Sequence, residues 1–290
     1  MVLRVQAPAK INRELRVGSR APDGYHPILS RFTSIELSDE LEAEPAEEFS
    51  FSTQGEPSPA DDSNHVVRAA RSLAARAGIP PRARIRLTKR VPSGSGLGGG
   101  SSDAAAALLL LSRLWELRLE EKEIEDLAAG IGSDVPFFLF GGEADVSGRG
   151  ERVHPREDIP RSEILLLVPP FPLSTEKVYA AYDALERSPR PLPSRLEIEG
   201  SGRFFGPNDL ASAVLQTDLR MATYLRTARE FASEVSITGS GSTIVLSGSS
   251  IDARQIVDRH PEVRLYLSRT LGRHEFRRRI NPTAEGATWT

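Results

Sequence analysis

The sequence predicts an α+β protein with two domains. Its 290 residues are long for a single hydrophobic core. Patterns typical of strands and of helices alternate along the chain, and a charged, proline-containing stretch at 155–163 interrupts them near the middle. The fully apolar segment Ile164–Val168, typical of a buried strand, follows this stretch. We therefore expect a first domain over residues 1–158 and a second over residues 159–290.

The first domain is predicted to begin with strands and to continue with helices. Apolar residues recur at helical spacing after Asn64, and Gly78 with the prolines behind it should end that helix. The segment 39–62 is acidic and contains prolines, which favours exposed strands and loops. The expected strands are 2–5, 11–17, 28–37, 49–53 and 84–88, the expected helices are 64–78, 101 to about 117 and 120–130, and a short helix opened by Pro136 precedes a hairpin at 144–153.

The second domain is predicted to repeat strands and helices. The segment 187–195, rich in proline, arginine and serine, should be a surface loop. The arginine cluster at 269–279 could touch nucleic acid, but it has few interleaved aromatic residues and is better interpreted as a solvated strand or terminal segment. The expected elements are strands at 164–168, 235–238 and 243–246 and helices at 175–185, 209–216 and 224–232.

Composition excludes several classes of function. The chain has 37 lysines and arginines against 40 aspartates and glutamates, a net charge of −3, which argues against a partner chosen by polyanion attraction. It has no cysteine, so it forms no disulfide and no thiolate metal site, as is typical of cytoplasmic proteins. Its longest apolar run, Ala104–Leu111, is far shorter than the roughly 20 residues that span a bilayer. We expect a soluble cytoplasmic protein, monomer or homodimer, without a nucleic-acid or membrane partner.

The most informative stretch is a glycine-rich run that begins at Pro92 and enters an alanine- and leucine-rich helix. Glycines let the backbone approach a ligand, and a helix N-terminus offers unpaired N–H groups, so the run predicts a phosphate site. It lacks the Lys-Ser/Thr of a P-loop and the last glycine of a Rossmann turn. A flexible linker fits poorly, because the run joins two segments that both look buried. The residues expected around the phosphates are Pro92, Ser93, Gly94, Ser95, Gly96, Leu97, Gly98, Gly99, Gly100, Ser101 and Ser102.

Four other features carry little information individually. A lysine and an amide near a strand edge are most often surface residues. An aspartate before a short helix is most often its N-cap, an aromatic residue next to histidine fits core packing, and a Gly-Ser step fits a hairpin turn. In chain order, these features are Lys10 with Asn12, Tyr25 with His26, Asp134, and Gly239 with Ser240.

Taken together and in order, these motifs resemble those of the GHMP kinases, the superfamily of galactokinase and of homoserine, mevalonate and phosphomevalonate kinases. The resemblance implies an active site in the cleft between two domains. The N-terminal domain would bind ATP and be ribosomal protein S5 domain 2-like, and the C-terminal domain would be a ferredoxin-like α/β sandwich that binds the substrate. The motifs that carry the resemblance are Pro8–Asn12, Asp23–His26, Gly96–Asp103, Gly132–Phe138 and Thr238–Ser242.

The motifs Asp23–His26 and Ser133–Phe138 resemble most the branch of this superfamily that serves the non-mevalonate route to isoprenoid precursors. That resemblance implies ATP-dependent phosphorylation, with Mg²⁺, of the 2-hydroxyl of a cytidine-diphosphate-linked methylerythritol. Phosphorylation of another small alcohol (mevalonate, phosphomevalonate or homoserine) and a non-catalytic nucleotide-binding regulator are the alternatives. The chain departs from the family at Arg13 and Glu14, where apolar residues are usual.

The same resemblance assigns roles to individual residues. Lys10 and Asp134 would be the catalytic pair beside the attacked hydroxyl, and Ser102 would be a magnesium ligand. Tyr25 and Tyr179 would hold the cytosine ring between them. Further substrate contacts are implied for Asn12, for His26 at the edge of cytosine, and for Thr175, Gly239 and Ser240.

Overall fold

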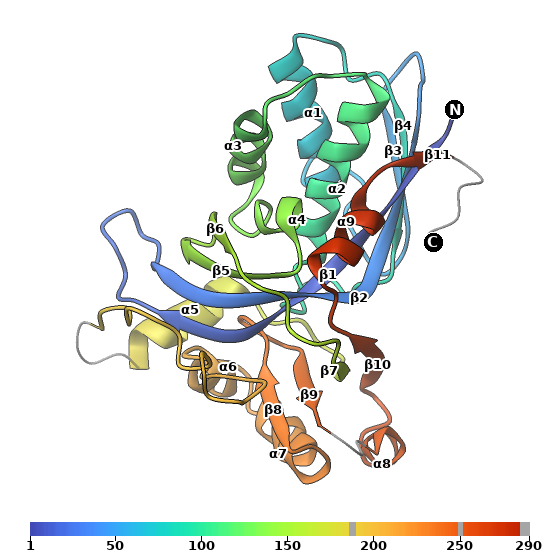
Figure 1. The fold of residues 1–290 in the computed structure, drawn as a ribbon. Helices are drawn as coiled ribbons and strands as arrows, with labels where there is room; N and C mark the ends of the chain where they lie inside the picture. Colours follow the sequence, from blue (N-terminus) through green and yellow to red (C-terminus); the bar gives the residue numbers. More distant parts are fainter. Residues whose placement is uncertain (186–189, 249–251, 285–290) are drawn as a thin grey trace.

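The computed structural model describes residues 1–185, 190–248 and 252–284 (Figure 1). The strands form two sheets, and helices pack against both of them, which confirms the predicted α+β class. None of the described helices is both long and apolar enough to cross a membrane.

The first sheet has seven strands. These are β1 (Leu3–Val17), β2 (Ile28–Glu44), β3 (Ser50–Gly55), β4 (Arg84–Lys89), β5 (Glu143–Gly148), β6 (Arg152–Pro155) and β11 (Thr283–Ala284). Five of them run in the order β11-β1-β2-β4-β3, while β5 pairs with both β2 and β6. The pairs are antiparallel except for β3 with β4.

The strand β1 corrects the first prediction, because it is one strand of 15 residues where two short ones were expected. Its register against β2 shifts between Pro8 and Lys10 and again between Asn12 and Glu14. Such irregularities bend a strand and re-aim its side chains. The interruption that the sequence suggested is therefore a local irregularity inside one long strand.

The strand β2 corrects the second prediction, because it continues to Glu44 through a segment expected to be exposed. Asp39 within it is fully buried. Its carboxylate accepts hydrogen bonds from the ammonium of Lys89 and from the backbone N–H groups of Arg90 and Val91. These partners offset the cost of burying the charge.

Three helices, α1 (His65–Ala77), α2 (Gly99–Leu114) and α3 (Glu121–Ile131), pack together beside the first sheet (Figure 1). As predicted, Gly78 ends α1 in the left-handed conformation, with φ 67°. The helix α2 starts at Gly99, earlier than expected, because the backbone turns at Gly98 (φ 70°) and no side chain caps it. The next short helix, α4 (Phe137–Phe140), also lacks a side-chain cap. Its N-cap residue is Pro136, which leaves the Asp134 carboxylate free for other contacts.

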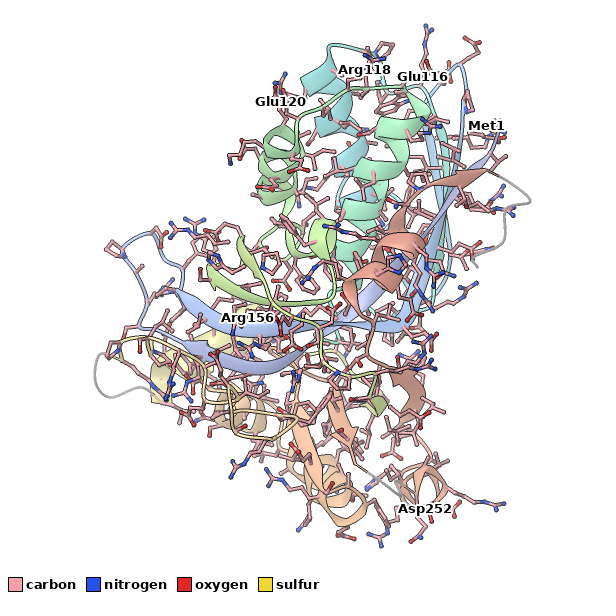
Figure 2. The ribbon with its side chains drawn as sticks, viewed as in Figure 1. Met1, Glu116, Arg118, Glu120, Arg156 and Asp252 are labelled. Atoms are coloured by element: carbon pink, nitrogen blue, oxygen red, sulfur yellow. The ribbon has the colours of Figure 1, made fainter. Side chains whose placement is uncertain are left out.

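The connection between α2 and α3 lies at the outer surface (Figure 2). Glu116, Arg118 and Glu120 are all exposed there, as are Arg156 and Asp252 elsewhere. Acids and bases alternate along this connection, in keeping with the small net charge of the chain.

The second sheet has the strand order β10-β7-β9-β8. The helix α7 packs on β8 and β9, and α8 packs on β10. The sequence patterns missed β10 and α8, and the loop expected at 187–195 lies partly outside the described residues. The elements are β7 (Glu163–Val168), α5 (Thr175–Leu185), α6 (Ala211–Thr217), α7 (Arg220–Phe231), β8 (Glu234–Ile237), β9 (Ile244–Ser247), α8 (Ala253–Arg259) and β10 (Arg264–Arg269).

The last described elements return to the first sheet. The helix α9 (Arg273–Ile280) packs on β1, and β11 pairs with β1. The division of the chain at residue 158 stays a prediction, and its second part contributes both a separate sheet and the edge strand of the first one.

Arg13 and Glu14, the departures from the family pattern, are both buried on β1. The guanidinium of Arg13 donates to both carboxylate oxygens of Glu143 at 2.9 and 2.8 Å. The Glu14 carboxylate accepts the backbone N–H groups of Glu197 and Ile198 at 3.0 and 2.8 Å. Because each charge is paired or hydrogen-bonded, polar contacts replace apolar ones in joining β1 to its surroundings.

The arginine cluster at 269–279 was expected to be a solvated strand or terminal segment. It forms the end of β10 and the helix α9, and two of its arginines are partly buried and form ion pairs. The guanidinium groups of Arg269 and Arg279 both bond Glu275 and Glu36. Hydrogen bonding from Arg269, with a further contribution from Arg279, lowers the pKa of Glu275 from 4.5 to about 2.

We expect Glu275→Gln to lower the free energy of unfolding at pH 7, and the loss to disappear in acid. A carboxylate with a depressed folded pKa stabilises the protein above its unfolded pKa, and this contribution is lost as the pH falls from about 4.5 to about 2. Urea unfolding of variant and wild type at several pH values measures it. Glu48→Gln, at an exposed position, is the control. A difference between Glu275→Gln and wild type that stays constant down to pH 2 would contradict the expectation.

Candidate active site

The glycine-rich loop connects β4 to α2 and lies against elements of both sheets (Figure 1). The backbone N–H of Lys10 on β1 donates to the carbonyl of Leu97 at 3.0 Å, and the N–H of Thr243 donates to the carbonyl of Ser95 at 3.1 Å. At Gly96 (φ 81°) a Cβ would lie 2.6 Å from the carbonyl oxygen of Thr238. Only glycine allows this approach, so the loop sits tightly between β1 and the turn that follows β8.

Two cavities meet at this loop. The larger, of about 710 Å³, and the smaller, of about 440 Å³, share Gly96, Gly98 and Thr175 in their walls. The larger cavity takes in the predicted Lys10, Asn12, Tyr25, His26, Asp134, Thr175, Tyr179, Gly239 and Ser240. The smaller cavity takes in the predicted Pro92, Ser93, Gly94, Ser95, Gly96, Leu97, Gly98, Gly99, Gly100 and Ser101, together with His65, Lys89 and Asp103.

Ser102 is the one predicted residue that neither cavity includes. Its side chain is fully buried, and its hydroxyl donates to the carbonyl of Pro8 at 2.7 Å. It thus ties the start of α2 to β1, and the structure does not bring it to the site as a metal ligand. Among the described residues, no group of three or more His, Asp or Glu side chains could hold a metal ion.

Lys10 and Asp134 face each other in the larger cavity, with 3.5 Å between Nζ and Oδ2. Lys10 is 3% exposed, and it lies over the ring of Phe32, with Nζ 4.5 Å from the centroid. Burial lowers the pKa of the Lys10 ammonium, and Asp134 offsets this in part. Residues 124 positions apart thus form a close charge pair. The pair lies beside the glycine loop, because a Cβ on Gly98 would lie 3.1 Å from the Lys10 side chain.

Asn12 holds this lysine in place. The Lys10 ammonium donates to Asn12 Oδ1 at 2.7 Å, and Asn12 Nδ2 donates to the hydroxyl of Ser30 at 2.9 Å. The Thr238 hydroxyl, at the end of β8, donates to the same Asn12 oxygen at 3.2 Å and accepts the Asn12 N–H at 2.8 Å. The amide side chain is buried, and both its oxygen and its nitrogen are hydrogen-bonded, so it orients the ammonium at the wall of the cavity.

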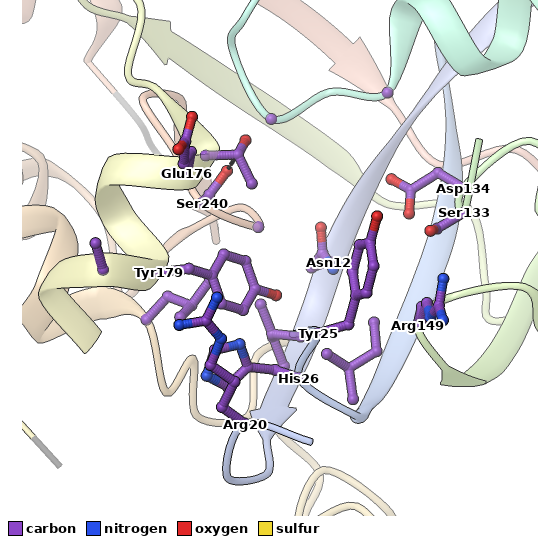
Figure 3. A pocket seen from close by; sticks show the side chains of 18 of the residues that line it. Asn12, Arg20, Tyr25, His26, Ser133, Asp134, Arg149, Glu176, Tyr179 and Ser240 are labelled. Atoms are coloured by element: carbon purple, nitrogen blue, oxygen red, sulfur yellow. Dashed lines mark hydrogen bonds between the residues drawn. The ribbon is translucent and has the colours of Figure 1, made fainter. Parts of the chain in front are cut away.

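Tyr25 and Tyr179 stand on opposite sides of the larger cavity (Figure 3). Tyr25 is 55% exposed, and the guanidinium carbon of Arg149 lies 4.0 Å from its ring centroid. The ring of Tyr179, on α5, lies 5.0 Å from that of His26. His26 is 8% exposed, and its Nε2 lies 2.7 Å from Asp183 Oδ1. Because a carboxylate only accepts, Nε2 carries the hydrogen of this bond.

The hydroxyls of Thr175 and Ser240 share a hydrogen bond of 2.9 Å, drawn as the dashed line at Ser240 in Figure 3. This bond joins the start of α5 to the turn that follows β8. Both elements therefore close the cavity from the side of the second sheet.

Sequence reasoning missed four charged residues that line the larger cavity, namely Arg20, Arg149, Glu176 and Asp183. For Asp183 a signal existed: with Thr175 and Tyr179 it forms an i, i+4, i+8 series on one face of α5. The others had no local signal, because each lies in the cavity through the fold alone.

The fold and this site define a kinase of the GHMP class, and the family model for the N-terminal domain of GHMP kinases matches residues 64–142. Two curated relatives are described as 4-diphosphocytidyl-2-C-methyl-D-erythritol kinase. That of Salinispora arenicola is 39% identical over 271 residues, 87% of this chain and 86% of that relative. That of Caldanaerobacter subterraneus subsp. tengcongensis is 43% identical over 183 residues, 63% of each chain.

A crystal structure of 4-(cytidine 5'-diphospho)-2C-methyl-D-erythritol kinase has the same fold, with a TM-score of 0.77 and 33% identity, and covers 93% of this chain and 99% of that one. The chain belongs to the 4-diphosphocytidyl-2-C-methyl-D-erythritol kinase family.

Proposed function

We propose that the protein transfers the γ-phosphoryl group of ATP to the 2-hydroxyl of 4-(cytidine 5'-diphospho)-2-C-methyl-D-erythritol, a step of the non-mevalonate route to isoprenoid precursors. The observation that carries the proposal is the meeting of two cavities at Gly96 and Gly98, beside the Lys10–Asp134 pair. A transferase needs two ligands whose reacting ends meet, and positioning supplies most of the catalysis in phosphoryl transfer.

ATP would occupy the smaller cavity. Its phosphates would lie at the glycine loop and at the N-terminus of α2, where backbone N–H groups and the helix dipole favour anions. The γ-phosphoryl group would then point across Gly98 toward Lys10.

The alcohol would occupy the larger cavity, with its reacting oxygen next to Asp134. As that oxygen bonds the γ-phosphorus and the bond to ADP breaks, the proton of the hydroxyl would pass to the Asp134 carboxylate. The Lys10 ammonium would stabilise the negative charge on the transferred group.

Mg²⁺ belongs to this proposal and fits the residues present. The ion is usually held by substrate phosphates and only one or two carboxylates, so a dedicated cluster of ligands is not required. Two carboxylates border the expected phosphates, Asp103 in the wall of the smaller cavity and Asp134 in the wall of the larger one, whereas the Ser102 hydroxyl is bonded to the Pro8 carbonyl. When bound, the ion would neutralise phosphate charge.

The cytosine ring would lie between Tyr25 and Tyr179, and His26 would read its edge. With Nε2–H bonded to Asp183, a neutral imidazole would offer Nδ1 as an acceptor, which suits the amino group of cytosine. We also propose a cytoplasmic location, because a chain without cysteine functions unchanged in a reducing compartment. The oligomeric state, monomer or homodimer, stays a prediction.

An assay of ADP release with a panel of alcohols tests the proposal. We expect turnover with the cytidyl-diphosphate substrate and none with mevalonate, phosphomevalonate or homoserine. Turnover of one of those alcohols alone would overturn the choice of substrate, and ATP binding without any turnover would favour a regulator.

We expect Tyr25→Ala to raise KM for the cytidyl substrate about tenfold and to leave KM for ATP within twofold, because stacking a base on an aromatic ring is worth roughly 1–3 kcal/mol. Steady-state kinetics with each substrate varied in turn measure this. Tyr25→Phe, which keeps the ring, should retain most of the affinity. Equal rises in both KM values for Tyr25→Ala would mean that the ring serves packing.

A further inference from the structure

Tyr25 is a large aromatic side chain on an exposed turn, and burial does not hold it. It is 55% exposed, and it lies in the turn between β1 and β2. A side chain that has to be ordered when a ligand arrives costs affinity, whereas one ordered beforehand does not. The contacts that fix the ring before binding therefore bear on how well it can stack.

Arg149 makes two contacts with this turn. Its guanidinium carbon lies 4.0 Å from the Tyr25 ring centroid, and its Nη2 donates to Asp23 Oδ2 at 2.7 Å. The other oxygen of that carboxylate, Oδ1, accepts the backbone N–H of Tyr25 at 3.0 Å. Arg149 thus contacts the ring directly. Through Asp23, it also holds the backbone of Tyr25.

The backbone at Arg149 is itself well anchored. It lies in the turn between β5 and β6, where its N–H donates to the carboxylate of Glu151 at 2.6 Å. The next residue, Gly150, has φ 123°, and a Cβ there would lie 3.2 Å from Asp134 Oδ1. The same turn therefore lies next to both the stacking residue and the candidate catalytic base.

Figure 3 shows Arg149 and Tyr179 on opposite sides of Tyr25. The guanidinium lies over the Tyr25 ring, and both side chains line the larger cavity. We propose that Arg149 is a positioning residue that holds the Tyr25 ring ready to stack against the base of the substrate. This inference rests on the proposed function and adds a residue that the sequence motifs do not contain.

The experiment measures KM for the cytidyl substrate and for ATP in Arg149→Ala. We expect KM for the cytidyl substrate to rise about five- to tenfold, as the loss of an exposed cation–π contact and an ion pair implies. The values of kcat and of KM for ATP should stay within twofold. Arg149→Lys, which keeps the charge without the planar guanidinium, should recover part of the affinity.

A double variant separates positioning from direct contact, because Arg149 also lines the larger cavity. If Arg149 acts through Tyr25, adding Arg149→Ala to Tyr25→Ala changes KM for the cytidyl substrate by less than twofold. Additive effects would mean that the guanidinium touches the substrate itself, and they would overturn the proposal.

Arg220→Ala is the matched control. Arg220 also lies over an aromatic ring, 3.8 Å from the centroid of Phe171, and pairs with an aspartate, Asp218, but it does not line the larger cavity. Its substitution should leave KM for the cytidyl substrate unchanged. An unchanged KM in Arg149→Ala, or the same change in both variants, would overturn the positioning role.

Binding of cytidine diphosphate, followed by calorimetry, separates this inference from the proposed function. Wild type that binds this probe without phosphorylating the cytidyl alcohol would refute the proposed reaction alone, and the loss of affinity in Arg149→Ala would still test the inference. Wild type that phosphorylates the alcohol while Arg149→Ala binds the probe equally well would refute the inference alone. Wild type that does neither would refute both.

Discussion

Replacing Asp134 by alanine is expected to lower kcat by about 10²- to 10⁴-fold, the range that a general base supplies. The Asp134 carboxylate lies 3.5 Å from the Lys10 ammonium, in the larger cavity and next to the glycine loop. ATP would bind in the smaller cavity, which Asp134 does not line. Binding of ATP should therefore change by less than threefold, and a fluorescent ATP analogue measures it apart from turnover.

Two further variants define the role of this carboxylate. Asp134→Asn keeps the size of the side chain and removes its basicity, so it should be about as inactive as Asp134→Ala. Ser133→Ala, the neighbouring residue in the same cavity, should keep kcat within threefold. A kcat of Asp134→Ala close to that of wild type would remove the base from the mechanism.

Replacing Lys10 by methionine is expected to lower kcat by about 10²-fold or more while making the protein more stable at pH 7. The loss of activity follows because a preorganised positive charge is worth that much at a transition state with developing negative charge. Methionine fills nearly the same space in this buried position, so the Phe32 ring keeps a neighbour.

The expected gain in stability follows from the pKa of Lys10, which burial lowers below 10.5. A lysine with a lowered folded pKa destabilises the folded state at every pH below its unfolded pKa, since the unfolded chain binds the proton more tightly. Wild type therefore bears this cost at pH 7, and the cost fades as the pH approaches 10.5. Urea unfolding at pH 7 and at higher pH measures it, and an equal or lower free energy of unfolding for Lys10→Met at pH 7 would contradict the expectation.

Local chemistry made parts of the fold predictable. The helix α1 follows from apolar residues at helical spacing between a capping asparagine and a C-terminal glycine, and both caps are formed. The strand β7 follows from five apolar residues in a row that are buried. Such signals are contained within a few neighbouring residues, so a linear pattern records them.

Other parts depended on partners far away in the chain. The helix α9 has four arginines, one histidine and only two apolar residues in its eight positions, so no amphipathic pattern predicts it. Its ion pairs reach Glu36 on β2, more than 240 residues earlier. Asp39 was expected to be exposed for the same reason, because the lysine that makes its burial possible lies on β4.

For the site, the sequence by itself determined the glycine loop at a helix start and the presence of Lys10, His26, Asp134 and the Gly239–Ser240 turn. Only the tertiary structure decided that these lie around two joined cavities, that Ser102 faces the interior, and that Arg149 and Asp183 belong to the site. The reason is physical: conformational preference acts between neighbours in the chain, whereas the distance between a lysine on β1 and an aspartate before α4 is set by strand register and packing.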